Sequence, residues 1–199
     1  MRVFSAYVLL LWALSSAGMF ADGGGWQQKD KGKPLRTPLQ YYRNFESLIG
    51  NDPVAEDASA DDFLIRLRRD FNNDGREDQA IAFNSSCGNK LCNFDLWLQD
   101  AAKHYRWVGT LPILPWGYGL LAKSRGVAEL QVCSGSGTQF YGMAALTISL
   151  DGISSDRERD KVLSAAGECQ LAELKSYPCE RCTLKELKRS GKCRWRRCE

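Results

Sequence analysis

Eight cysteines in a chain of 199 residues constrain this sequence more than any other feature. Their number is even, and an even set in an exported protein predicts disulfides, whereas the same set in a cytosolic protein would indicate zinc. The cellular compartment therefore decides how these residues are interpreted. The cysteines are Cys87, Cys92, Cys133, Cys169, Cys179, Cys182, Cys193 and Cys198.

Residues 1–21 have the features of a secretory signal peptide. Arg2 provides the positive start, Tyr7–Leu14 form a short apolar core, and small residues follow at Ser15–Gly18. The apolar run is shorter than the roughly 20 residues that a membrane-spanning helix needs. We therefore expect a secreted or periplasmic protein with disulfides and without a transmembrane segment.

Composition divides the rest of the chain into three parts. Residues 22–36 are rich in Gly and Lys and predict a flexible leader. Residues 37–154 begin with a short amphipathic helix and continue as short stretches of alternating apolar residues separated by turn residues. Residues 155–199 are predicted to form a helical, basic, cysteine-rich tail.

The alternating stretches predict the fold class. Phe63–Leu67, Phe94–Leu98 and the run from Phe140 to Leu150 each have the period of a half-buried strand. No predicted helix of 10–15 residues separates them, which disfavours a parallel sheet. We therefore predict a mainly β fold with minor α: an antiparallel meander, small sheet or propeller-blade-like domain, followed by a disulfide-bonded helical tail.

The segment Asp70–Asp78 (DFNNDGRED) carries side-chain oxygens at its first, third, fifth and ninth positions. These residues are Asp70, Asn72, Asp74 and Asp78. Gly75 permits a sharp bend, and calcium prefers six to eight oxygen ligands from a flexible loop, so the spacing predicts a Ca²⁺ site to which the carbonyl of Arg76 also contributes. An Asx-rich turn without metal is the alternative, because Asn and Asp are common in turns.

The segment differs from an EF-hand, since Ile81 stands where the bidentate Glu would be and the preceding residues predict a strand. It resembles the calcium loop of the integrin-type FG-GAP and VCBS repeats, in which a DxDxDGxxD turn links two antiparallel strands of a propeller blade. The resemblance covers about 25 of the 199 residues, fewer than the four blades of a propeller require. It implies that Ca²⁺ is bound by the side chains of Asp70, Asn72, Asp74 and Asp78 and by the carbonyl oxygen of Arg76.

The cysteine spacing suggests some pairings and leaves others open. Cys87 and Cys92 bracket four residues between two predicted strands, which suits a loop-closing disulfide. The sequence around them, NSSCGNKLCNFDLWL, resembles a pattern of uncharacterised secreted bacterial proteins that carry the same type of calcium loop. Cys133 and Cys169 are partners by elimination. The four tail cysteines allow three pairings, and a Cys₄ zinc site or a redox CxxC pair are the alternatives to structural disulfides.

The tail is strongly basic. Residues 175–199 carry nine Lys or Arg and three Glu. Thr183 and Glu186 form a capping box, which predicts a short helix that stops before Gly191. Guanidinium groups beside an aromatic side chain can hold phosphate or sulfate. The tail is therefore a candidate surface for binding an anionic surface, a polysaccharide or a protein. A solvated basic face without a partner is the alternative. The candidate ligand-binding residues are Lys188, Arg189, Arg194, Trp195, Arg196 and Arg197.

The sequence identifies no catalytic residue. His104 is the single imidazole, which excludes mechanisms that need two, and a net charge of +3 gives no indication of nucleic acid as the partner. We expect a secreted, calcium-stabilised binding or interaction module of unknown ligand. The alternatives are an inhibitor of a secreted hydrolase, with the Cys87–Cys92 hairpin as its protruding element, and a hydrolase whose catalytic residues the sequence does not identify.

Overall fold

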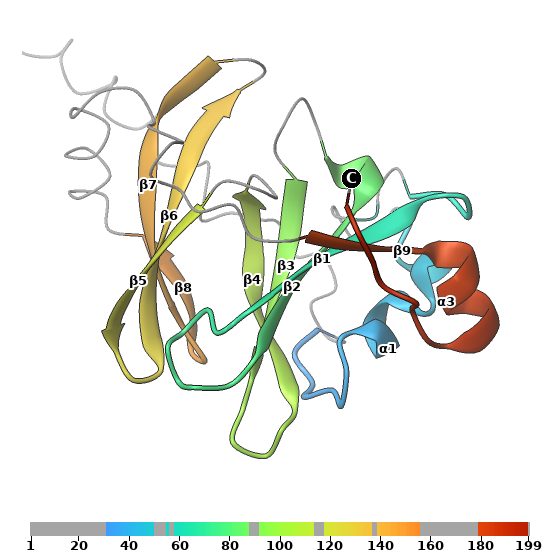
Figure 1. Ribbon diagram of the computed structural model, residues 1–199, viewed down its shortest axis with the longest axis horizontal. Helices are drawn as coiled ribbons and strands as arrows, with labels where there is room; N and C mark the ends of the chain where they lie inside the picture. The colour runs from blue at the N-terminus through green and yellow to red at the C-terminus, as the bar shows by residue number, and fades with distance from the viewer. Residues whose placement is uncertain are drawn as a thin grey trace, which may run out of the picture.

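The computed structural model describes residues 31–49, 55, 58–87, 92–113, 118–136, 139–155 and 179–198. The predicted signal peptide, the first part of the leader and the predicted helical stretch up to residue 174 lie outside this description. Two antiparallel sheets and a layer of short helices lie in three layers, with the six-stranded sheet in the middle (Figure 1). The predicted mainly β fold is confirmed.

The middle sheet has the strand order β10-β9-β1-β2-β3-β4. Its larger part is a meander of β1 (Phe63–Arg69), β2 (Asp78–Phe83), β3 (Cys92–Gln99) and β4 (Tyr105–Ile113). The tail extends the sheet beyond β1, because β9 (Cys179–Thr183) pairs with β1 and β10 (Arg196–Arg197) pairs with β9. The second sheet is a four-stranded meander of β5 (Tyr118–Ser124), β6 (Val127–Ser136), β7 (Gln139–Ser149) and β8 (Gly152–Ser155).

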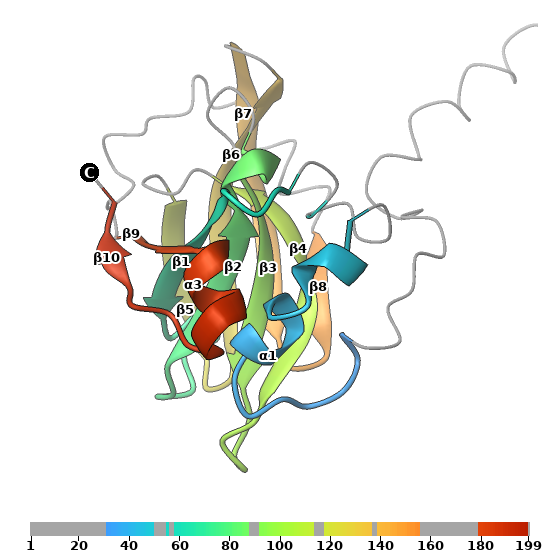
Figure 2. The ribbon, with the colours of Figure 1, turned by 90° about the vertical axis from the view of Figure 1, so that its right-hand side faces the viewer.

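The helices cover the face of the middle sheet that points away from the second sheet (Figure 2). They are α1 (Leu39–Tyr42), the 3-10 turn η1 (Phe45–Ser47) and α3 (Leu184–Ser190), while a further 3-10 turn, η3 (Asn84–Ser86), follows β2. The predicted cap of α3 is confirmed: the Thr183 side chain accepts a hydrogen bond from the Glu186 N–H, and Gly191 ends the helix with φ of +65°. No helix within the described ranges is long and apolar enough to cross a membrane.

Both faces of the middle sheet are therefore buried. Along β3, Phe94, Leu96 and Leu98 pack into the core between the two sheets, whereas Trp97 lies in the core beneath the helices. Leu64 of β1 is also fully buried on the helix side. The sequence predicted half-buried strands, and the structure differs because α1 and α3 cover the second face.

Three disulfides lie among the described residues: Cys87–Cys92, Cys179–Cys198 and Cys182–Cys193. The first confirms the predicted loop closure. In the tail, each cysteine of the CxxC motif pairs with a cysteine further along the chain, so these four residues are structural disulfides and not a zinc site or a redox pair. The predicted Cys133–Cys169 pairing lies outside the described residues.

Candidate functional site

The predicted calcium loop connects β1 to β2 and is anchored by a buried aromatic side chain. Phe71 is fully buried in the core between the two sheets. Asn73 and Gly75 have φ of +58° and +87°, the left-handed conformation that Asn and Gly adopt most easily. These two residues produce the tight turn that brings the acidic side chains of the loop together.

The first carboxylate of the loop holds the turn closed. Asp70 Oδ1 accepts a hydrogen bond from the Asp74 N–H at 3.0 Å, and its Oδ2 accepts one from the Gly75 N–H at 2.8 Å. Asp74 Oδ1 in turn accepts from the Arg76 N–H at 2.8 Å. The spacing predicted from the sequence therefore produces a loop in which successive side-chain oxygens face its own backbone.

The last carboxylate connects the loop to the neighbouring strand. Asp78, fully buried, accepts hydrogen bonds from the N–H groups of Phe71 and Gln99, both at 2.8 Å. The pKa of Asp78 is raised to about 7, chiefly by burial and in smaller part by the carboxylates of Asp74 and Asp70, while the two backbone N–H groups oppose the change. The surroundings of Asp78 therefore disfavour its charged form.

Asn72 contributes an oxygen that no group of the protein satisfies. Its side chain is fully buried, and its Nδ2 donates to Asp74 Oδ2 at 2.9 Å. Its Oδ1 has no hydrogen-bond partner. Leaving a buried acceptor unsatisfied costs about 1–3 kcal/mol, so this oxygen indicates an interaction that the polypeptide does not supply.

The loop lies where the two sheets meet. Asn73 accepts a hydrogen bond from the Gly126 N–H through its backbone oxygen, and its side chain donates to the Ser124 carbonyl, both at 3.3 Å. These partners belong to the β5–β6 turn of the second sheet. Arg76 Nε donates to the Gln99 carbonyl at 2.8 Å at the end of β3. Ordering this loop would therefore stabilise the junction between the sheets.

The donor set of the loop consists of the oxygen ligands that a hard divalent cation prefers. Within the described parts of the chain, no three Asp, Glu, Cys or His side chains are arranged so that they could hold a metal ion. Arg76 forms an ion pair with Asp74. When all three carboxylates are ionised, this one guanidinium leaves two negative charges, which a Ca²⁺ ion would neutralise.

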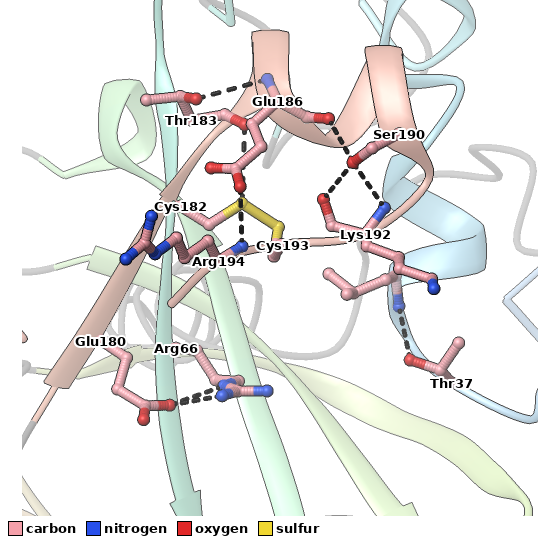
Figure 3. Close-up of a disulfide and its surroundings, with 11 residues drawn as sticks. Thr37, Arg66, Glu180, Cys182, Thr183, Glu186, Ser190, Lys192, Cys193 and Arg194 are labelled. Atoms are coloured by element: carbon pink, nitrogen blue, oxygen red, sulfur yellow. Dashed lines mark hydrogen bonds and ion pairs between the residues drawn. A yellow bond between two sulfur atoms is a disulfide. The ribbon is translucent and has the colours of Figure 1, made fainter. Parts of the chain in front are cut away.

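The second candidate site, the basic tail, is held against β1 by an ion pair and an aromatic contact. Arg66 Nε donates to Glu180 Oε2 at 2.9 Å (Figure 3). The Arg66 guanidinium also lies 3.9 Å from the centre of the Trp195 ring. Burial lowers the pKa of Arg66, an effect that the hydrogen bond to Glu180 opposes. Trp195 therefore packs against a side chain of its own protein, which favours an anchoring role over stacking on a ligand.

The remaining predicted ligand-binding residues are exposed around α3 and β10. Lys188 is ion-paired with Glu46. The Arg194 N–H donates to Glu186 at 3.1 Å, which ties the chain after α3 back to the helix (Figure 3). The exposed basic residues of this tail surface are Lys185, Lys188, Arg189, Lys192, Arg194, Arg196 and Arg197.

A shallow hollow beside α3 gives no support to the hydrolase alternative. Among the described residues, Asp61 is the single acidic one that lines it, together with Phe45, Ala60, Lys185, Lys188 and Arg189. Glycoside hydrolysis requires two carboxyl groups that face the scissile bond. The Cys87–Cys92 disulfide is formed, but residues 88–91 at the tip of its hairpin lie outside the described residues.

A buried carboxylate on β3 was missed by the sequence reasoning. Asp95 is fully buried on the helix side of the sheet and forms an ion pair with Lys31 at 2.9 Å. The sequence signal was available: an acidic residue between Phe94 and Leu96 occupies the opposite face of a buried strand. Lys31 was interpreted as part of a flexible leader, but its side chain is buried at the sheet, and Leu35 pairs with Tyr105.

Comparisons with protein-family models, with curated proteins and with solved structures find no match for this chain.

Proposed function

We propose that this protein is an exported binding module in which calcium stabilises the β1–β2 loop and the basic tail surface contacts an anionic partner. Three disulfides support export, because disulfides persist in oxidising compartments. The resemblance of DFNNDGRED to the FG-GAP and VCBS loops supports calcium as the ion.

The observation that carries the calcium proposal is the unsatisfied Oδ1 of Asn72. A cation would supply the partner that this buried oxygen lacks and would reduce the repulsion between Asp70, Asp74 and Asp78. The side chains of these four residues and the carbonyl of Arg76 would hold the ion. Because the loop contacts the β5–β6 turn, the ion's role would be structural: it would hold the two sheets together.

Calorimetric titration of the disulfide-bonded protein with CaCl₂, paired with thermal melts, tests this proposal. If calcium binds, a free Ca²⁺ concentration 100-fold above the Kd would stabilise the protein by about 2.7 kcal/mol. Asp70→Ala should abolish the heat and the stabilisation, since it removes a ligand and the acceptor for two backbone N–H groups of the turn.

Asp151→Ala is the matched control, because Asp151 is an exposed aspartate outside the loop. It should bind and respond to calcium as the wild type does. No heat and no stabilisation of the wild type would leave DFNNDGRED an ordinary Asx-rich turn. Equal stabilisation of the wild type and of Asp70→Ala would show that calcium acts elsewhere.

The anionic partner is supported by the charge of the tail. Seven exposed Lys or Arg lie on the tail surface. Glu180 of the tail forms ion pairs with Arg66 and Arg68 of β1, so its negative charge is already compensated there. Since β10 is an edge strand, its two arginines also serve to discourage edge-to-edge pairing. A solvated face that protects this edge is the competing explanation.

Retention on a heparin column separates these explanations. Arg196→Ala combined with Arg197→Ala should elute at lower salt than the wild type, because fewer cations contact the polyanion. Arg36→Ala combined with Arg125→Ala removes two exposed arginines elsewhere on the protein and is the control. Equal shifts for the two double variants would indicate attraction by net charge alone and would contradict a specific tail surface.

A further inference from the structure

The Asp95 carboxylate lies in a polar and aromatic site between the middle sheet and the helices. Tyr42 Oη donates to its Oδ2 at 2.9 Å, while Trp107 Nε1 and Thr110 Oγ1 donate to its Oδ1 at 3.0 and 2.6 Å. Trp97 Nε1 in turn donates to Tyr42 Oη at 3.0 Å, which orients the phenol. The carboxylate is thus held in one position by neutral donors from α1 and β4.

The positive charge in this site comes from a separate part of the chain. Lys31 Nζ is 2.9 Å from Asp95 Oδ1, and it lies 5.1 Å from the centre of the Tyr41 ring and 5.2 Å from that of Trp107. A carboxylate with flanking aromatic faces is the arrangement that proteins use to bind ammonium groups, since the ring faces attract a cation. We define Asp95, Tyr41, Tyr42, Trp107 and Thr110 as the ammonium site.

The segment that delivers Lys31 contributes no side chain to the ammonium site as defined above. Residues 32–34 are exposed, and Leu35 forms a backbone pair with Tyr105 through hydrogen bonds of 2.9 and 2.7 Å. By contrast, the side chains of the ammonium site come from β3, β4 and the region of α1. Removing the Lys31 side chain would therefore leave the ammonium site intact, because the side chains that form the site belong to other elements.

From this separation we propose that the ammonium site is a binding site for primary alkylammonium groups, filled in this structure by the protein's own Lys31. The site is independent of the calcium loop. Its selectivity follows from its chemistry: the buried carboxylate requires a cation, and the faces of the neighbouring rings attract the ammonium group. A free alkylammonium ion of lysine-like length would occupy the site when Lys31 is removed.

Chemical rescue of Lys31→Ala with n-butylammonium chloride tests the proposal. The variant should melt on the order of 10 °C below the wild type, because a buried carboxylate loses its counter-charge. Butylammonium at about ten times its Kd should raise the melting temperature of the variant by several degrees relative to NaCl of equal ionic strength. The wild type should show no such difference, because Lys31 fills the site.

Two further variants make the result specific. Adding Asp95→Asn to Lys31→Ala should abolish the rescue, and Lys103→Ala, which removes an exposed lysine of the β3–β4 turn, should melt and respond as the wild type does. An equal response of Lys31→Ala to butylammonium and NaCl would overturn the proposal, as would a rescue that persists without Asp95. If Lys31→Ala does not fold unaided, its yield on refolding with each salt becomes the readout, and equal yields would overturn the proposal.

Discussion

The β1–β2 loop and the Asp95 site both bury carboxylates at the middle sheet, but they differ in how the charge is compensated. Asp95 has one ammonium and three neutral donors, all from the chain itself. The loop has three carboxylates and one guanidinium, and the Oδ1 of Asn72 has no partner. A buried charge that the chain fully compensates needs nothing from solution, whereas one that it compensates in part favours an external cation.

The largest effect should follow from breaking the compensated site. Asp95→Ala leaves the buried Lys31 ammonium and the buried Tyr42 hydroxyl without their acceptor, so we expect the free energy of unfolding to fall by about 3–5 kcal/mol. Urea denaturation with and without CaCl₂ measures this. Calcium should stabilise the variant as much as the wild type, and a lost calcium response would show that the two sites are coupled.

Adding charge to the under-compensated loop should have the next largest effect. Asn72→Asp removes the Nδ2 donor to Asp74 and places a fourth carboxylate in the loop, so without calcium the protein should lose about 2–3 kcal/mol. With saturating calcium most of this loss should disappear. Thermal melts in EGTA and in CaCl₂ compare the two conditions, and an equal loss in both would indicate a turn that binds no metal.

Removing one neutral donor from Asp95 should have a smaller effect. Thr110→Val keeps the β-branched shape but removes the hydroxyl that donates to Oδ1, and because Thr110 is exposed, water can partly replace it. We expect a loss of about 1–2 kcal/mol in denaturant melts. Thr110→Ser restores the hydroxyl and should recover most of the stability; failure to recover would assign the loss to packing.

The smallest effect should follow from removing the guanidinium group of Arg76, which forms an ion pair with Asp74 inside the loop. Arg76→Met removes the partly exposed partner of Asp74, so we expect the calcium-free protein to lose about 0.5–1 kcal/mol. Calcium affinity should rise several-fold, since the ion no longer competes with a guanidinium. Calorimetric titration measures the change, and an unchanged or weaker affinity would contradict the idea that Arg76 substitutes for the ion.

Local sequence signals predicted the elements that depend on near neighbours. The capping box of α3 involves residues three apart, and the Cys87–Cys92 disulfide closes a short loop between two strands. The turn of the acidic loop similarly follows from Asp70, Gly75 and their spacing. In each case the interacting groups are so close along the chain that few alternative arrangements compete.

The tertiary structure decided the features that join distant segments. Lys31 and Asp95 are 64 residues apart, and Arg66 and Glu180 are 114 apart. The pairings Cys179–Cys198 and Cys182–Cys193 follow from the position of β9 beside β1, which also makes the tail a part of the sheet.

By itself, the sequence determined the mainly β class, the acidic turn and the cap of α3, because periodicity and spacing act over a few residues. The burial of the second face of the middle sheet was decided by the packing of α1 and α3. That packing also buried Asp95 in its ion pair with Lys31, since a strand's pattern records which side each residue faces but not what covers that side.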